Sequence, residues 1–487
     1  MNPVSYLLFR LRMTPKAIAI LSPTQSITYE QLYKFVLQLS YRFREMGLKK
    51  GQAILFEISD QGLEWALILA SFHEGLTSCT GIRGGKLPEN LIFDYLITDI
   101  ELSNKDVVYA KKNIVLNENW FKSLGNMVDW APVDYQVLNL PCRFSLTSGT
   151  TGVKKAIPIT AEIWIKRATY IESIYAVYGR GLSMLGLSTT TGFMAALTGL
   201  INGKPFVVFR NIQDIINFIN KGQVDSLLST PALLRRVVEK IEKNKIPIKP
   251  LRAVRSFGSV IPIQLAEKVG QILSPNLINH FGSTETGSTC SFVMTPQNLR
   301  EGSYAGYPLP GVKVQIVNEK DESLELGSEG IVRISTPYMA NEYHNNPEAT
   351  EISFKHGWFY PGDRGVVGHD GMLSLSGRIS ETINRGGVKI NPALIDREAL
   401  MIKGVVDAAT FSIPDKYGLP ILCMAWKLTY EADEENIKVQ LRGAVGEAKT
   451  PTFFVRADEI PRNETGKPLR SELTNQYVDI LRKKINV

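Results

Sequence analysis

Short apolar runs alternate with helix-like segments along the first half of the chain, and this alternation limits the fold more than any other feature. Pairs of an apolar run and a following helical pattern lie at 53–58 with 63–73, at 205–209 with 212–220, and at 226–229 with 231–243. Strands that alternate with helices form a sheet buried under helices on both faces. The sequence therefore predicts an α/β fold built from β/α layers.

The length and the change of pattern along the chain predict more than one domain. A chain of 487 residues exceeds what one hydrophobic core usually carries. Beyond about Pro308 the pattern turns to short strands between acidic turns, and a compact mixture of helices and strands begins near Pro392. We expect a large N-terminal domain over 1–379, with layered β/α sheets and a β-rich subdomain, and a small mobile α+β domain over 380–487.

Composition and charge narrow the classes of ligand. With 44% hydrophobic and 21% charged residues, the chain has the composition of a globular protein. Its net charge of +7 favours anionic ligands such as nucleotides, coenzyme A or an acidic carrier domain. The positive charges are spread along the sequence without an arginine-rich arm or zinc-finger spacing, which argues against nucleic acid.

The cysteines and the N-terminus predict the compartment. The four cysteines lie far apart and form no CxxC pair, so we expect buried, reduced thiols. The first twelve residues contain only a short apolar run, which indicates neither a cleavable signal nor a membrane-spanning helix. The expected location is cytoplasmic, without integral membrane association.

A loop rich in hydroxyl residues and glycine is the first candidate binding element. The stretch from Ser145 to Ala156 holds five serines and threonines, two glycines and two lysines. Glycines let backbone N–H groups converge on an anion, hydroxyls add donors, and lysine neutralises charge. It is not a Walker A loop, because only two residues separate Gly149 from Gly152, where that motif has four, and Val153 precedes the lysines. Taken alone, it could equally be a flexible surface turn.

Further stretches follow in order along the chain. Gly258-Ser259 and Phe281-Gly282-Ser283-Thr284-Glu285 come after strand-like runs, and we expect both to be turns at the carboxyl edge of a sheet. The others are Tyr360-Pro361-Gly362-Asp363, Gly377-Arg378 followed by Ile383-Asn384-Arg385-Gly386-Gly387, and Pro461-Arg462 ending in Gly466-Lys467. Each is short, and each residue alone could be a turn or surface residue.

Together and in this order, these stretches resemble the adenylate-forming (AMP-binding) superfamily of acyl- and aryl-CoA ligases, peptide-synthetase adenylation domains and luciferases. The resemblance spans nearly the whole chain. It implies a ligase in which a carboxylate attacks the α-phosphate of ATP, giving acyl-AMP and pyrophosphate, before a thiol displaces AMP. Such chemistry requires cations and hydrogen-bond donors around the phosphorus rather than acid–base groups. The implied cofactors are ATP, Mg²⁺ and coenzyme A or a carrier-protein phosphopantetheine.

The resemblance also implies a role for each matching residue in the first half-reaction. The β- and γ-phosphates would be wrapped by Thr147, Ser148, Gly149, Thr150, Thr151 and Gly152, with Lys155 as the loop lysine. Glu285 would coordinate Mg²⁺ and Thr284 would bond the α-phosphate or the carboxylate. Gly258, Ser259 and Phe281 would border adenine. Asp363, with Arg378 beside it, would accept the ribose hydroxyls, and Lys467 would bridge the carboxylate and the α-phosphate.

For the second half-reaction, the resemblance implies rotation of the small domain about a hinge at Ser380. The rotation would withdraw Lys467 and bring Arg385, Gly386 and Gly387 to the site, where a pantetheine arm could pass. Ser380 also fits a helix N-cap.

Departures from the family pattern bear on the substrate. Thr189 stands where many acid:CoA ligases have a histidine, so the usual gating of carboxylate entry is in doubt. Relatives that take α-amino acids place an aspartate in this region, and none occurs from Leu182 to Ile212. Because a buried ammonium without a partner is costly, the sequence favours an acid without an α-amino group. An aromatic acid and a short or medium aliphatic acid both remain open.

Three functional alternatives remain. The first is an acid:thiol ligase, in which transfer to coenzyme A is slightly favoured over loading of a carrier protein. A non-catalytic nucleotide-binding relative is the second class, although Lys467, Glu285 and Asp363 are all present. A luciferase-like oxygenase would share the adenylating half-reaction, and nothing in the sequence specifically supports it.

Overall fold

The structure is a computed structural model. It describes residues 2–81, 87–88, 90–100, 109–122, 130–135, 140–147, 154–175, 179–295, 304–385, 388–415, 418–463 and 466–485.

The N-terminal part contains a six-stranded sheet in the order β6-β5-β3-β4-β7-β8. All neighbours are parallel except β7 and β8, which pair antiparallel. Along the chain the strands are β3 (Ala53–Glu57), β4 (Thr77–Thr80), β5 (Phe93–Thr98), β6 (Ala110–Val115), β7 (Arg143–Thr147) and β8 (Lys155–Ile159). The predicted alternation of strands and helices is therefore confirmed here.

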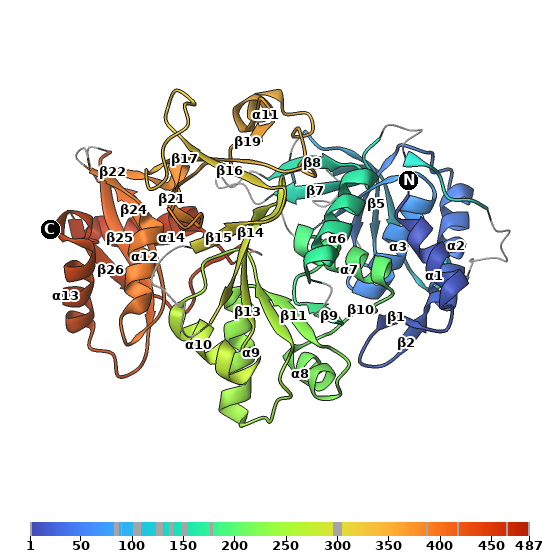
Figure 1. Cartoon of the computed structure of the whole chain (residues 1–487), viewed down its shortest axis with the longest axis horizontal. Coiled ribbons are helices and arrows are strands. Elements are labelled where there is room, and N and C mark those ends of the chain that lie inside the picture. Colours follow the sequence, from blue (N-terminus) through green and yellow to red (C-terminus); the bar gives the residue numbers. More distant parts are fainter. Residues whose placement is uncertain are drawn as a thin grey trace.

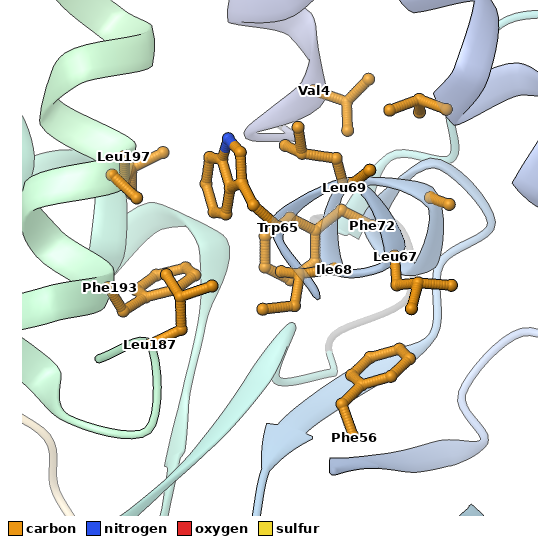
Figure 2. Close-up of a cluster of buried hydrophobic side chains, with 14 of the residues drawn as sticks. Val4, Phe56, Trp65, Leu67, Ile68, Leu69, Phe72, Leu187, Phe193 and Leu197 are labelled. Carbon is orange, nitrogen blue, oxygen red and sulfur yellow. The ribbon is translucent and has the colours of Figure 1, made fainter. Parts of the chain in front are cut away.

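Helices pack on this sheet through long apolar faces. They are α1 (Val4–Met13), α2 (Tyr29–Glu45), α3 (Gln61–His73), the short α4 (Glu118–Lys122), α6 (Ala161–Tyr175) and α7 (Thr190–Asn202). Thr28 and Gln31 form a capping box that fixes the start of α2. In Figure 2, Trp65 of α3 points toward Phe193 and Leu197 of α7, and the rings of Trp65 and Phe193 meet edge to face at 5.9 Å. A small sheet of β10 (Phe206–Val207), β1 (Ile18–Leu21) and β2 (Ser26–Thr28) lies beside them.

A second, twelve-stranded sheet forms the centre of the molecule (Figure 1). Its first strands, β9 (Gly181–Ser183), β11 (Ser226–Ser229), β12 (Ala253–Ser256) and β13 (Leu277–Ser283), are parallel neighbours in this order. The helices α8 (Ile212–Asn220), α9 (Pro231–Asn244) and α10 (Ile263–Ile272) connect them. Buried side chains of these strands and helices form a second hydrophobic core.

The same sheet continues as an antiparallel, β-rich region, as the sequence predicted beyond Pro308. Its strands are β14 (Gly287–Met294), β15 (Tyr304–Pro308), β16 (Lys313–Val317), β17 (Gly330–Ser335), β18 (Phe354–Lys355), β19 (Trp358–Phe359), β20 (Asp363–Val367) and β21 (Leu373–Arg378), with helix α11 (Pro347–Ser353). Cys290, Val332 and Leu373 belong to a separate buried cluster in this region.

The C-terminal part is a small α+β unit at one end of the molecule, opposite the N-terminal helices (Figure 1). It contains the hairpin β22 (Ile383–Arg385) and β23 (Val388–Ile390), and the sheet of β24 (Val405–Pro414), β25 (Pro420–Leu428) and β26 (Phe453–Arg456). Its helices are α12 (Pro392–Met401), α13 (Glu434–Val445) and α14 (Arg470–Ile485). Side chains from α12 and α13 pack in one core of this sheet and those of α14 in another.

The structure corrects three local expectations. Gly282 lies inside β13, at a shift of register against β14, and the turn begins only at Thr284. A Cβ on Gly282 would lie 2.2 Å from the carbonyl oxygen of Gly287, so only glycine fits this close approach. The apolar run over 181–187 predicts a strand, but β9 ends at Ser183. Ser380 is not an N-cap, because it lies within a 3₁₀ turn, Ile379–Glu381, preceded by Arg378.

The four cysteines are free and buried, as expected. Among the helices in the described ranges, none combines the length and apolar character that crossing a bilayer requires.

Candidate active site

A large cavity lies where the N-terminal sheet, the central sheet and the small domain meet. Its volume is about 910 Å³. The lining residues come from the ends of β7 and β8, from the turn after β13, from the turn just before β20, from the end of β21, and from the loop that precedes α14. The cavity thus collects most of the stretches that the sequence singled out.

The ends of the phosphate-loop candidate lie at this cavity. Thr147 and Lys155 are opposite each other in the β7–β8 pair and both line the cavity. The Lys155 ammonium lies over the ring of Tyr343, 4.5 Å from its centre. Ser148, Gly149, Thr150, Thr151 and Gly152, which were predicted to contact phosphate, lie outside the described residues.

Glu285 occupies the turn between β13 and β14, with its side chain buried. Its Oε1 accepts a hydrogen bond from the Tyr343 hydroxyl at 2.8 Å. Burial and this neighbouring carboxylate raise the pKa of Tyr343, so its hydroxyl remains a donor. The carboxylate is therefore held in a defined position at the cavity wall.

A buried arginine fixes the backbone of the same turn. The guanidinium of Arg167, from α6, donates to the carbonyl oxygens of Tyr338, Thr284 and Glu285 at 3.0, 3.0 and 2.8 Å. Burial lowers the pKa of Arg167 to about 10, which leaves it charged at neutral pH. Arg167 consequently joins α6 to the turn that carries Thr284 and Glu285.

Thr284 faces a second polar turn. Its hydroxyl lies 3.1 Å from that of Thr190, the first residue of α7. Thr189 precedes it as the N-cap and accepts a hydrogen bond from the Gly192 amide. A Cβ on Gly192 would lie 2.1 Å from the Gly186 carbonyl oxygen, so the turn requires glycine there. Thr189, which stands where many acid:CoA ligases have a histidine, therefore caps the start of α7.

The expected adenine neighbours surround the next part of the cavity. Gly258 and Phe281 line it, and Gly258 has φ of +91°. Ser259 does not line it, and its hydroxyl oxygen lies 3.7 Å from where a Cβ on Gly466 of the small domain would stand. Phe257 and His280 stack at 4.4 Å between ring centres. Burial and the charge of Arg255 lower the pKa of His280 well below its usual range, so this histidine is neutral.

The buried Asp363 and the partly exposed Arg378 form an ion pair across β20 and β21. The Asp363 Oδ1 is 2.8 Å from the Arg378 Nε, and the Arg378 guanidinium also donates to the Pro361 carbonyl. The Asp363 Oδ2 is buried and accepts no hydrogen bond from a described residue. Burial raises the pKa of Asp363, while Arg378 and Lys467 oppose this shift. A buried oxygen with open lone pairs fits a ligand that donates hydroxyl groups.

Lys467 is delivered to the cavity by a folded loop of the small domain. Its amide donates to the Asn463 side-chain oxygen at 2.9 Å, and Arg462 donates to the Gly466 carbonyl at 2.7 Å. Burial and the charge of Arg378 lower the pKa of Lys467, and Asp363, Glu381 and Glu285 act in the opposite direction. The lysine therefore stands among the groups predicted to bind the nucleotide.

The small domain is held against α9 in this arrangement. Arg235 of α9 donates to the Val406 carbonyl at 3.2 Å, and its Nη2 is 3.7 Å from the Asp407 Oδ2. The Asp407 Oδ1 is 2.6 Å from the Arg462 Nη2. One carboxylate thus connects a helix of the large domain with the loop that carries Lys467.

The segment around Ser380 joins the two parts. The Ile379 amide donates to the Gly362 carbonyl at 2.8 Å, in the large domain. Glu381 pairs at 3.0 Å with Arg470, which also pairs with Asp396 of the small domain. Ile379 thus contacts the large domain, whereas Glu381, two residues later, contacts the small domain.

Arg385 is the described residue of the Arg385-Gly386-Gly387 turn that was predicted to meet pantetheine, and it does not line the cavity. Arg385 instead donates to the Thr450 carbonyl at 3.3 Å and to the Thr452 hydroxyl at 3.2 Å, within the small domain. Gly386 and Gly387 lie outside the described residues.

Tyr343, Arg167 and Arg255 also line the cavity, and none of them was predicted from the sequence. Arg167 lies in the middle of a helix and Arg255 in a strand, so neither carries a local signal. Tyr343 lies just before the Asn346-Pro347 start of α11, a helix start that could have been noticed.

The described residues contain no group of three or more His, Cys, Asp or Glu side chains that could hold a metal. Glu285 is the single carboxylate among the described residues that line the cavity. This donor set fits Mg²⁺ that arrives bound to phosphate oxygens better than a resident metal.

Comparison with known proteins agrees with this site. The family model described as AMP-binding enzyme matches residues 104–344. The chain belongs to this AMP-binding enzyme family.

Several relatives resemble it over almost their full length. The 2-succinylbenzoate–CoA ligase of Bacillus subtilis is 23% identical over 480 residues, covering 96% of this chain and 97% of the relative. The fatty acid–[acyl-carrier-protein] ligase ScoC of Streptomyces coeruleorubidus is 24% identical, covering 98% and 97%. The structure of the o-succinylbenzoate CoA synthetase MenE of B. subtilis in complex with ATP and magnesium ion superposes with a TM-score of 0.83 at 21% identity, covering 96% and 98%. The mixed α/β fold with a small C-terminal α+β domain is therefore shared with these ligases.

Proposed function

We propose that this chain is an AMP-forming acid:thiol ligase, which activates a carboxylic acid with ATP and then transfers the acyl group to coenzyme A. One observation carries the proposal. Lys467 of the small domain lies in the same cavity as Thr284, Glu285 and both ends of the phosphate-loop candidate. This arrangement collects cations and donors around one point, as attack on a phosphate requires.

In the first half-reaction, a carboxylate oxygen of the substrate forms a bond to the α-phosphorus of MgATP. The bond from that phosphorus to the bridging oxygen of pyrophosphate breaks, and pyrophosphate leaves with the electron pair. Lys467 would neutralise the charge on the carboxylate and the α-phosphate, and Thr284 would donate a hydrogen bond there. Glu285 would hold Mg²⁺, which neutralises the phosphate oxygens.

The remaining groups would bind ATP without taking part in bond changes. The open lone pairs of the Asp363 Oδ2 suit the ribose hydroxyls, with Arg378 holding the carboxylate in place. Phe281, Gly258 and Ser259 would border adenine. Thr147, Lys155 and the segment 148–152 would receive the β- and γ-phosphates.

In the second half-reaction, a thiolate attacks the acyl carbonyl and AMP leaves. Because Lys467 lines the cavity while Arg385 is bonded within the small domain, we propose that the small domain reorients between the two steps. Ile379 contacts the large domain and Glu381 the small domain, which supports a hinge at Ser380 and a domain boundary between 379 and 380. The Arg385-Gly386-Gly387 turn would then meet pantetheine.

Coenzyme A is the proposed acceptor, and a carrier-protein phosphopantetheine is the alternative. The relatives named as ligases include both a CoA ligase and an acyl-carrier-protein ligase. We also propose a cytoplasmic location, since four free, buried cysteines fit a reducing compartment.

The proposed substrate lacks an α-amino group. Among the described residues that line the cavity, Glu285 is the single carboxylate, and it is bonded to Tyr343. A substrate ammonium would therefore lack a carboxylate of its own in this cavity.

The test is ATP-dependent pyrophosphate release with a panel of aromatic, aliphatic and amino acids, without thiol, with coenzyme A, and with a phosphopantetheinylated carrier. Mass spectrometry identifies the product. We expect one acid class to give release, with turnover on adding coenzyme A. Turnover only with the carrier would support the alternative, and ATP binding without release for any acid would contradict a ligase.

A further inference from the structure

The cavity continues from the proposed reacting centre along the whole length of helix α7. This helix begins at Thr190, whose hydroxyl lies 3.1 Å from that of Thr284. Its cavity-lining residues recur at intervals of three and four, so they form one face of the helix: Thr191, Met194, Ala195, Thr198, Gly199 and Asn202. From Thr190 to Asn202 the helix advances about 18 Å, at a rise of about 1.5 Å per residue. We call the part of the cavity along this face the α7 channel.

The far end of the α7 channel lies toward the opposite edge of the central sheet. The carboxyl end of β9 leads into the turn before α7, and α7 packs against β9. Gly179 and Gly181, just before and at the start of β9, line the same cavity as Asn202 and Lys204 at the end of α7. Lys204 is exposed. The channel therefore runs from the edge that carries Thr284 toward the molecular surface at the other edge.

The middle turns of α7 present carbon rather than hydrogen-bonding groups to the channel. Met194 and Ala195 have apolar side chains, and Gly199 has none. The Thr198 Oγ1 is buried, so this threonine offers the channel no hydroxyl. Leu228 of β11 also lines the cavity. A ligand at this level would thus be surrounded largely by apolar groups.

Polar groups next to the channel are engaged within the protein. The Arg167 guanidinium donates to three backbone carbonyls, and Arg255 also interacts with other groups of the protein. The Asn202 Nδ2 donates to the Thr198 carbonyl at 2.8 Å. A ligand in the α7 channel would therefore be held mainly by burial of its apolar surface.

The far end of α7 is fixed in position. Gly203 ends the helix as its C-cap with φ of +65°. Arg10 of α1 donates to the carbonyls of Leu200 and Ile201 in the last turn. Because both ends of α7 are held, the channel has a defined length.

We propose that the substrate is an unbranched aliphatic acid whose chain lies extended along the α7 channel. This inference rests on the proposed function, since it places the adenylated carboxylate beside Thr284. An extended chain advances about 1.2 Å per bond, as the polypeptide backbone does, so a span of about 18 Å holds roughly fifteen bonds. Acids of about 12–16 carbons would fill the channel. A single aromatic ring would occupy little more than the first turn of α7 and leave the rest unfilled.

The experiment measures ATP–pyrophosphate exchange with unbranched acids of increasing length, from butyrate to stearate, and with benzoate. Each methylene buried in the channel should raise kcat/KM about fourfold, because its removal from water contributes about 0.8 kcal/mol. The increase should stop at about 16 carbons, where the chain end passes Asn202. An ω-hydroxydecanoate should be poorer than decanoate, because its hydroxyl would be buried among apolar groups.

Two variants test whether α7 measures the chain. Ala195 and Thr198 lie about 7.5 and 12 Å beyond Thr190 along the helix axis. With kcat/KM expressed relative to butyrate, Ala195→Phe should end the increase at about six carbons and Thr198→Phe at about ten. Thr169→Phe is the matched control, because Thr169 is exposed on the neighbouring helix α6. Thermal melting checks folding, and Ala195→Leu and Thr198→Leu should give the same order if a phenylalanine variant does not fold.

The outcomes separate the two levels of the proposal. A wild-type kcat/KM that does not rise beyond the shortest acids, or that is highest with benzoate, would overturn the inference while supporting the ligase. Folded variants at positions 195 and 198 that stop the increase at the same length, or not at all, would show that the chain does not lie along α7, and would also overturn it. No exchange with any acid would contradict the ligase itself.

Discussion

The contact of Arg235 with the small domain gives a direct test of the two-orientation mechanism. In the structure this arginine reaches from α9 to Asp407 and to the carbonyl of Val406, while Lys467 lies in the cavity. If the small domain reorients for thioester formation, the contact stabilises only the orientation used for adenylation. Replacing Arg235 by glutamine should therefore weaken the first half-reaction and spare the second.

The expected size follows from the exposure of the pair. The Arg235 side chain is 32% exposed and that of Asp407 is 9% exposed, so the pair is neither a surface pair nor a fully buried one. Asp407 keeps its closer partner Arg462 at 2.6 Å, and no buried charge is left alone by the substitution. The ion pair with Asp407 and the hydrogen bond to Val406 together should stabilise the adenylation orientation by about 1 kcal/mol. Their loss corresponds to about a fivefold change in the equilibrium between the two orientations.

The assay measures the half-reactions separately. ATP–pyrophosphate exchange reports adenylation, and thioester formation from a synthetic acyl-adenylate reports transfer. Arg235→Gln should lower kcat/KM for exchange about fivefold and leave transfer unchanged or faster, and the difference should shrink at high salt. Arg236→Gln is the control, because Arg236 is the exposed neighbour on the same helix.

Unchanged exchange in Arg235→Gln would show that the contact does not stabilise this orientation. An equal loss in both half-reactions, with a lower Tm, would indicate a folding defect and refute the proposed division between the steps.

Three other predictions concern the site and its turns. Lys467→Ala should abolish exchange but not transfer from the acyl-adenylate. In the wild type, kcat/KM for exchange should rise with pH as Asp363 ionises at a raised pKa, and it should fall at higher pH as Lys467 loses its proton at a lowered pKa. If the fall at high pH persists in Lys467→Arg, another group causes it. Asp363→Asn should weaken ATP binding much more than binding of the acid by calorimetry, and equal ATP affinity would remove Asp363 from the ribose site. Gly192→Ala should lower the free energy of unfolding by about 3 kcal/mol, because the new methyl group would clash with the Gly186 carbonyl. Gly270→Ala, in helix α10 with open space around it, should raise the free energy of unfolding by about 0.5–1 kcal/mol. Denaturant titration measures both variants, and similar stabilities would contradict the packing argument.

The parts of the fold that local chemistry determines were predictable. The helix over 212–220 and the strand over 226–229 have the predicted bounds, because a cap or a turn residue stands at their ends. Gly282 was misjudged, since its place inside a strand depends on the approach of Gly287 from β14. Such a contact between paired strands leaves no trace in the nearby sequence.

In the candidate site, too, the residues in recognisable local stretches could be predicted, whereas those placed by tertiary contacts could not. Thr284, Glu285 and Lys467 could be found because they lie in short polar stretches, and the structure brings them to one cavity. Their roles remain predictions. Arg167 and Arg255 could not be found, because each acts on groups that only the tertiary fold brings near. Arg167, for example, bonds carbonyls more than a hundred residues away along the chain.

Tyr343 has a consequence for how the site is prepared to receive its ligand. Its ring lies under the Lys155 ammonium and its hydroxyl bonds Glu285, so one neutral side chain stands between a cation and an anion. Without it, the two charges could pair with each other, and a triphosphate and its metal would have to break that pair on entry. With it, the positive and negative ends stay separated in advance, which lowers the reorganisation that binding requires.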